Sequence, residues 1–118
     1  MEQDTPHVLF VEDEDDLRSI IQDALAQHGY QVTLARNGRE ALEHLRWDGA
    51  FSHVVTDVSM PEGVSGLDIA AQALQQRPSP RVVVASGYQR SQLAPLPDGA
   101  HFLPKPYRIR QLLAALGD

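Results

Sequence analysis

Five short apolar runs alternate along this chain with stretches of helical periodicity. The runs are Val8–Val11, Tyr30–Ala35, His53–Thr56, Arg81–Ala85 and Ala100–Leu103. Short continuous runs such as Val8–Val11 are typical of strands that are buried on both faces, as in parallel sheets, whereas Tyr30–Ala35 alternates weakly and is still expected to be a strand. The alternation therefore predicts an α/β sandwich, in which right-handed crossovers place helices on the faces of a parallel sheet.

The spacing of apolar residues between these runs predicts the helices. Clear helical patterns cover residues 17–25, 41–45, 67–74 and 109–116; Gly29 ends the first, and Ser65 is the expected cap of the third. After Gly87 the pattern weakens, and residues 89–93 allow only a turn or two because Pro95 and Pro97 follow. We also expect a turn at Asn37-Gly38 and a loop over residues 60–66.

Composition narrows the possible functions. The chain has 118 residues, the length of one domain, and 42% of them are hydrophobic. It has no cysteine, which excludes thiolate metal sites and disulfides and fits a cytoplasmic location. A net charge of −6 without a basic cluster argues against direct nucleic-acid binding, and no apolar stretch is long enough to span a membrane.

Polar side chains stand where the predicted strands end. Glu12 and Asp13 follow the first run, Asp57 the third, Ser86 the fourth, and Lys105 lies just beyond the fifth. The carboxyl ends of parallel strands meet at one edge of a sheet, where ligands bind in such folds. We therefore expect three carboxylates, a hydroxyl and an ammonium to share one small cleft.

This set of groups has the chemistry to accept a phosphoryl group. Three neighbouring carboxylates need a compensating cation, and oxygen ligands favour a hard ion such as Mg2+. A carboxylate can act as the nucleophile and form an aspartyl phosphate, while a metal and a lysine neutralise the phosphoryl oxygens.

Each motif alone also has a plainer interpretation. The five acids at residues 12–16 stand at a helix start, where the helix dipole favours them, and Asp57 alone fits a turn. Ser86-Gly87 is an ordinary exit from a strand. The combination at four strand ends is what favours a functional site.

Several segments together resemble the receiver domains of two-component signalling. They are Val11-Glu12-Asp13, Asp57-Val58-Ser59-Met60-Pro61, Ser65-Gly66-Leu67, Val84-Ala85-Ser86-Gly87-Tyr88 and Phe102-Leu103-Pro104-Lys105-Pro106. The resemblance covers nearly the whole chain and implies a single receiver domain over residues 1–118. It implies a flavodoxin-like (βα)5 three-layer sandwich with the strand order 2-1-3-4-5, its fourth helix short.

The resemblance also implies roles for individual residues. Asp57 would be the phosphoacceptor; Glu12, Asp13, Asp57 and the backbone carbonyl of Ser59 would hold Mg2+ or Mn2+. Lys105 would contact the phosphoryl oxygens, and Ser86 would swing toward them.

The aromatic switch residue of the family would be Phe102, which would turn inward but lacks the hydroxyl of the more usual tyrosine. Ser59 and Tyr88 flank the acceptor, and we expect them to tune the lifetime of the phosphoryl group by positioning or blocking the attacking water.

The implied phosphodonor is a histidine kinase or a histidine phosphotransfer domain. The chain would assist its own phosphorylation and later hydrolysis, and would act on a downstream partner that the sequence does not name. Whether the chain is free-standing or part of a larger protein stays open. Dimerisation stays open too, because the short fourth helix alters the face through which many members signal.

Three alternatives compete with this interpretation, and two of them have specific tests. Asp13-x-Asp15 mimics the nucleophile motif of haloacid-dehalogenase phosphatases, which would turn over phosphate esters. A flavin-binding electron carrier would absorb visible light, but five acids after the first strand would repel its phosphate. An interaction module independent of phosphorylation would not need the acceptor and lysine that this chain retains.

Overall fold

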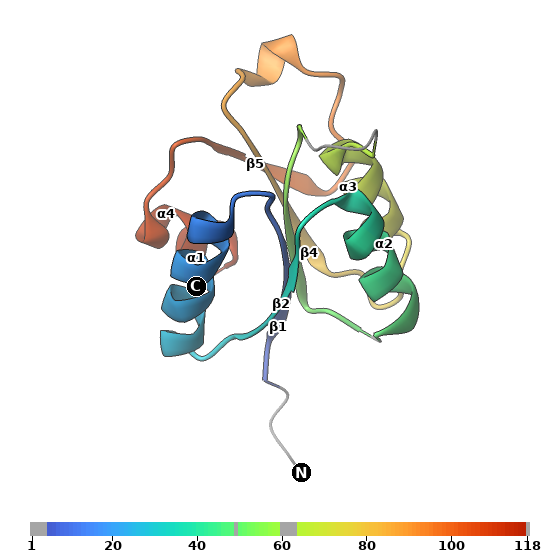
Figure 1. Ribbon diagram of the computed structural model, residues 1–118. Helices are drawn as coiled ribbons and strands as arrows, with labels where there is room; N and C mark the ends of the chain where they lie inside the picture. Colours follow the sequence, from blue (N-terminus) through green and yellow to red (C-terminus); the bar gives the residue numbers. More distant parts are fainter. Residues whose placement is uncertain (1–4, 49, 60–63, 118) are drawn as a thin grey trace.

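A computed structural model describes residues 5–48, 50–59 and 64–117 of the chain, and its centre is one parallel sheet (Figure 1). The strands are β1 (His7–Val11), β2 (Gln31–Ala35), β3 (His53–Asp57), β4 (Arg81–Ser86) and β5 (Ala100–Pro104). They pair in parallel in the order β2-β1-β3-β4-β5. The expected α/β architecture and strand order are confirmed.

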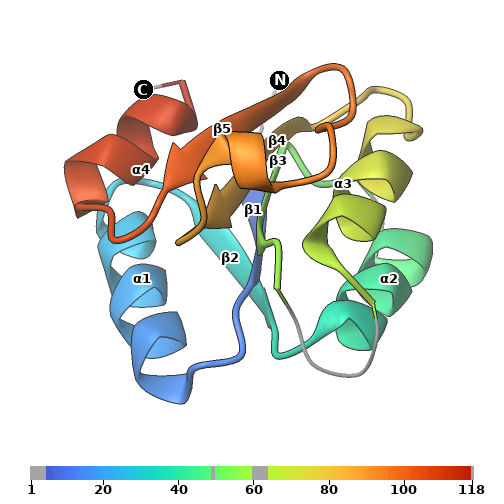
Figure 2. The same cartoon turned by 90° about the horizontal axis from the view of Figure 1, so that it is seen from above.

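Helices form a layer on each side of this sheet. They are α1 (Asp15–Gln27), α2 (Gly38–Trp47), α3 (Gly66–Leu74) and α4 (Ile109–Ala115). Figure 2 shows α1 and α4 against one face and α2 and α3 against the other. No helix among the described residues is both long and apolar enough to cross a bilayer.

The three central strands, β1, β3 and β4, bury both of their faces, which explains their largely apolar sequences. Val8 and Phe10 of β1 belong to the cluster beneath α1 and α4, whereas Leu9 and Val11 belong to the cluster beneath α2 and α3. All four are at most 1% exposed. Alternate side chains of one strand therefore pack against opposite helical layers. This packing fixes the position of the strand and of the residues at its carboxyl end.

The connection from β4 to β5 differs from the other crossovers. Where a fourth α-helix was expected to be short, the chain forms only a three-residue 3-10 turn, Arg90–Gln92. It is the orange turn that projects at the top of Figure 1. Leu93 and Leu96 of the same connection pack against the core on the α2–α3 side, so part of the segment takes the place of a helix.

One local expectation has a different outcome, and another falls mostly outside the described residues. The Asn37-Gly38 pair is not a separate turn: Asn37 is the N-cap of α2, and its side chain accepts a hydrogen bond from the Glu40 amide at 2.9 Å. The misreading arose because asparagine and glycine favour caps as well as turns. Residues 60–63 of the expected loop over 60–66 lie outside the described residues.

Candidate functional site

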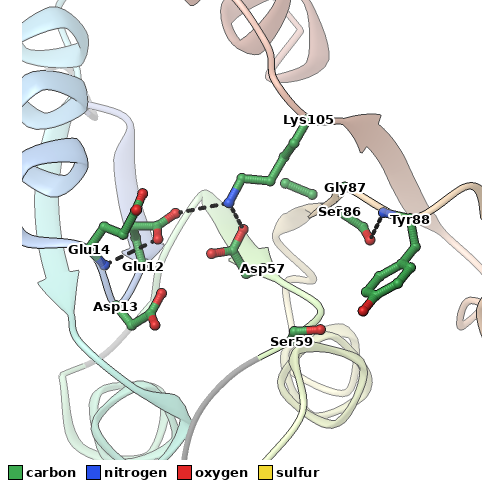
Figure 3. Close-up of a pocket in the computed structure, with 10 residues that line it drawn as sticks. Glu12, Asp13, Glu14, Asp57, Ser59, Ser86, Gly87, Tyr88 and Lys105 are labelled. Carbon is green, nitrogen blue, oxygen red and sulfur yellow. Dashed lines mark hydrogen bonds and ion pairs between the residues drawn. The ribbon is translucent and has the colours of Figure 1, made fainter.

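An acidic pocket opens at the carboxyl end of the sheet, with a volume of ≈ 300 Å³. Its lining residues are Glu12, Asp13, Glu14, Asp57, Ser59, Ala85, Ser86, Gly87, Tyr88 and Lys105. They come from the ends of β1, β3 and β4 and from the residue after β5 (Figure 3). The structure thus gathers the predicted strand-end residues into one site.

Asp57 is the last residue of β3 and is only 7% exposed. The Val58 amide donates to the Ala85 carbonyl at 3.0 Å, and the Gly66 amide donates to the Val58 carbonyl at 2.8 Å. The backbone that carries the Asp57 side chain is therefore fixed by both β4 and the start of α3. A carboxylate held in this way is pre-positioned at the floor of the pocket.

Lys105 reaches across the pocket to two carboxylates. Its Nζ lies 2.8 Å from Asp57 Oδ1 and 3.5 Å from Glu12 Oε1. Its own amide donates to the Ser86 carbonyl at 2.8 Å, which ties the residue to the end of β4. Burial alone would lower the pKa of Lys105, but the hydrogen bond and charge of Asp57, together with Glu12, outweigh it and raise the pKa.

Glu12 is the most buried acid of the pocket, at 2% exposed. Burial is the main reason that the pKa of its carboxyl is raised to about 8, and the hydrogen bond and charge of Asp57 add to the effect. The Glu14 amide, which donates to Glu12 Oε2 at 3.2 Å, and the charge of Lys105 act in the opposite direction. A metal cation in the pocket would further favour the ionised form of this carboxylate.

Asp13 completes a set of three acids suited to a metal ion. One carboxylate oxygen from each of Glu12, Asp13 and Asp57 lies within 4.8 Å of the others. Asp13 is exposed, whereas the other two are buried, so the group has one side open to solvent and to a ligand. The donors are all oxygens, the preference of Mg2+, and an open side leaves room for the waters that Mg2+ retains.

Ser86 ends β4, Tyr88 follows it in the next loop, and Ser59 follows β3; all three line the pocket (Figure 3). The Ser86 hydroxyl accepts a hydrogen bond from the Tyr88 amide at 2.9 Å, which links the strand end to the loop that follows. The Tyr88 side chain is exposed and Ser59 is exposed beside Asp57. Phe102 of β5 pairs with Val84 of β4 and is half-buried. Among the described residues, it is not one of those that line the pocket.

Sequence reasoning missed two residues that support the site. Arg18 of α1 is buried, and its Nη1 donates to the Glu12 carbonyl at 2.8 Å. Its place beside Leu17 and one turn before Ile21, at the edge of the apolar stripe, was an available signal. Gly66 was placed at the end of a loop and in a family motif without a structural role, whereas an added Cβ there would lie 1.7 Å from the Asp57 carbonyl oxygen.

Comparisons with known proteins agree with this geometry. The family model of the response regulator receiver domain matches residues 8–117. The response regulator receiver protein CpdR of Brucella abortus is 34% identical over 109 residues, which are 90% of this chain and 89% of that protein. The chain spans about half the length of several other curated relatives that it matches.

Solved structures show the same fold. A response regulator receiver protein from Sinorhizobium medicae has a TM-score of 0.86 and 29% identity, covering 96% of this chain and 92% of that one. The response regulator protein TrrA of Thermotoga maritima, crystallised in complex with Mg(2+)-BeF, has a TM-score of 0.77 and 28% identity. That likeness covers 92% of this chain and 94% of TrrA.

Proposed function

Because this chain belongs to the family of response regulator receiver domains, we propose that it is a switch that accepts a phosphoryl group on the Asp57 carboxylate. Membership makes it a component of two-component signalling, a signalling rather than a catalytic protein, and implies a histidine kinase as the phosphodonor. The observation that carries the proposal is the buried Asp57 carboxylate, with Lys105 Nζ at 2.8 Å and two further acids beside it.

The proposed transfer uses a phosphohistidine on a kinase or a histidine phosphotransfer domain. An Asp57 carboxylate oxygen attacks phosphorus, the phosphorus–nitrogen bond breaks, and the imidazole leaves with the electron pair and takes a proton from solvent. Lys105, already 2.8 Å from the acceptor, holds one phosphoryl oxygen as a point charge. Hydrolysis returns the protein to its unphosphorylated state. Water attacks phosphorus, the bond between phosphorus and the Asp57 oxygen breaks, and the products are the free carboxylate and inorganic phosphate.

Glu12, Asp13, Asp57 and the backbone carbonyl of Ser59 are the proposed ligands of Mg2+, or of Mn2+ in its place. The fit of three clustered carboxylates and the Mg(2+)-BeF complex of TrrA support this assignment. When bound, the ion supplies positive charge that offsets the charge of the phosphoryl oxygens. Before that, the Lys105 ammonium is the cation nearest the acceptor among the residues of the pocket.

The response to phosphorylation is proposed to begin at Ser86. Its hydroxyl now accepts from the Tyr88 amide. If the Ser86 side chain rotates away from the Tyr88 amide to donate to a phosphoryl oxygen, the bond from that amide is lost and the loop from Gly87 onward is released from the end of β4. Phe102, half-buried in β5, then has space to turn inward, and the changed surface meets the downstream partner.

The residues weaken the rival interpretations. Asp15, the second acid of the phosphatase-like motif, is the first residue of α1 and pairs with Arg18. Five acids at residues 12–16 occupy the place where a flavin carrier needs a phosphate loop. The acceptor and lysine remain in contact, as a phosphorylation-dependent switch requires.

Incubation with acetyl phosphate and Mg2+, read by intact mass, tests the proposal. The chain should gain one phosphoryl group, and neither Asp57→Ala nor a sample treated with a chelator should gain it. Asp23→Asn, which alters an exposed acid on α1, is the matched control and should be phosphorylated like the parent. Addition to Asp57→Ala, or no addition to the parent chain, would refute the assignment.

A further inference from the structure

Arg18 is a buried charged group that the proposed phosphoryl transfer does not use. It lies in the first turns of α1 and is only 9% exposed, whereas arginines on helix surfaces are normally solvated. A buried guanidinium is costly unless its donors are satisfied. What Arg18 bonds to therefore indicates why the fold keeps it inside.

Its two partners lie on either side of the acidic turn between β1 and α1. Nη1 donates to the Glu12 carbonyl at 2.8 Å, and Nη2 pairs with the Asp15 carboxylate. The Asp13 ligand lies between these two anchors in sequence. The planar fork of one guanidinium thus spans the turn, a geometry that a lysine ammonium cannot reproduce.

The rest of Glu12 is fixed by other elements. Its amide donates to the Ala35 carbonyl of β2 at 3.0 Å, and its carboxylate contacts the Glu14 amide and Lys105. The Glu12 carbonyl is the remaining polar group, and Arg18 holds it. The N-cap of α1, Glu14, makes no side-chain capping bond. The two donor bonds of Arg18 tie the turn before α1 to the helix.

We propose that Arg18 is a positioning residue of the metal site, whose fork holds the Glu12–Asp15 turn so that the Glu12 and Asp13 carboxylates converge with Asp57. The inference rests on the proposed function, because it concerns the same Mg2+ ligands. Partners that orient metal ligands in this way commonly change metal affinity when they are replaced. Arg18 would therefore set how tightly Mg2+ binds, not how fast the loaded site reacts.

Three variants separate this role from a charge effect and from a general loss of stability. Arg18→Met removes the fork and the charge but keeps an apolar stem. Arg18→Lys keeps the charge and removes the fork. Arg81→Met is the matched control, since Arg81 Nε donates to the Ala115 carbonyl at 2.7 Å at the opposite edge of the sheet. Binding is measured by Mn2+ titration with EPR and by competition with Mg2+.

Both Arg18 variants should bind Mg2+ roughly tenfold more weakly, and Arg81→Met should match the parent within about twofold. At saturating Mg2+, acetyl phosphate should label the Arg18 variants at nearly the parent rate. If Arg18→Met proves unstable, Arg18→Lys alone decides. Parent-like Mg2+ affinity in Arg18→Lys, or tighter binding in Arg18→Met, would show that only charge or stability is involved and would overturn the inference.

The same experiment distinguishes the two proposals. A parent chain that neither binds Mg2+ nor takes up a phosphoryl group contradicts the proposed function itself. A parent chain that does both, with Arg18→Lys behaving identically, contradicts only the role of Arg18.

Discussion

The Glu12 carboxylate sits between an ammonium and two other acids, and its charge depends on what else enters the pocket. It is nearly fully buried, and burial with the neighbouring Asp57 raises its pKa to about 8. Without a metal ion, the folded protein therefore retains a proton near neutral pH that an unfolded glutamate has already lost. This difference links the charge of one residue to the stability of the whole fold.

The first prediction is that the contribution of Glu12 to the stability of the metal-free protein falls as the pH rises from about 4.5 to about 8, because its carboxyl then keeps a proton in the folded state that it has lost in the unfolded state. Glu12→Gln removes this titration. The difference between the parent and the variant should change by about 2 to 4 kcal/mol across the window. Urea denaturation at several pH values in the presence of a chelator measures it. A difference that is independent of pH would contradict the raised pKa.

A second residue-scale prediction concerns Tyr88, whose exposed ring lines the pocket. Removing the ring in Tyr88→Ala should open the acceptor to water and speed dephosphorylation by about two- to tenfold. Ser59→Ala, at the other exposed position beside Asp57, should also change the rate. Trp47→Ala removes an exposed aromatic side chain from the end of α2, outside the pocket lining, and should leave the rate unchanged. Loss of labelled phosphate over time gives the rates; equal rates in all proteins would refute the tuning role.

At the scale of elements, the central strands β1, β3 and β4 were predictable because burial on both faces leaves a mostly apolar run. The run Val82-Val83-Val84 has no helical alternative of adequate length, and it is the buried centre of β4. The connection after β4 was harder to predict. Its prolines set an upper limit on helix length, but the sequence did not show that Leu93 and Leu96 would pack on the core in place of a helix. Such packing depends on contacts distant in the chain.

The start of α3 provides a test of how closely an element approaches the acceptor. An added Cβ at Gly66 would lie 1.7 Å from the Asp57 carbonyl oxygen, and backbone cannot yield as a flexible side chain can. Gly66→Ala should therefore destabilise the fold by about 3 kcal/mol or more and weaken phosphorylation of Asp57. Gly87→Ala, with nothing within 4 Å of the added Cβ, is the control and should be nearly neutral. Chemical denaturation of both variants gives the comparison, and equal stabilities would contradict the close approach.

For the molecule as a whole, the site was predictable to the extent that a parallel sheet brings strand ends together. Glu12, Asp57 and Lys105 belong to three separate strand ends, and the topology alone placed them at one edge. Their contacts depend on details that no local pattern contains. The register of β4 with β5 pairs Ser86 with Pro104, and this brings Lys105 within 2.8 Å of Asp57. The role of Arg18 was not predicted for a similar reason. Its two partners, the Glu12 carbonyl and the Asp15 carboxylate, come together only when the turn between β1 and α1 has folded.

Three acids gathered at one edge form a site that a bound cation should stabilise. A ligand that binds only the folded state stabilises it in proportion to the logarithm of its concentration above Kd. We expect Mg2+ at about ten times its Kd to raise the free energy of unfolding by about 1.4 kcal/mol and Tm by several degrees. Sodium chloride at equal ionic strength should have little effect, because screening acts weakly on buried charges.

Asp13→Asn removes one proposed ligand and should lose most of the Mg2+ shift while keeping the fold, since Asp13 is exposed. Thermal melts of the parent and of Asp13→Asn in the two salts measure the shifts in Tm. An equal Tm shift with sodium chloride, or a full Mg2+ shift in Asp13→Asn, would show that the cation does not bind at the three acids.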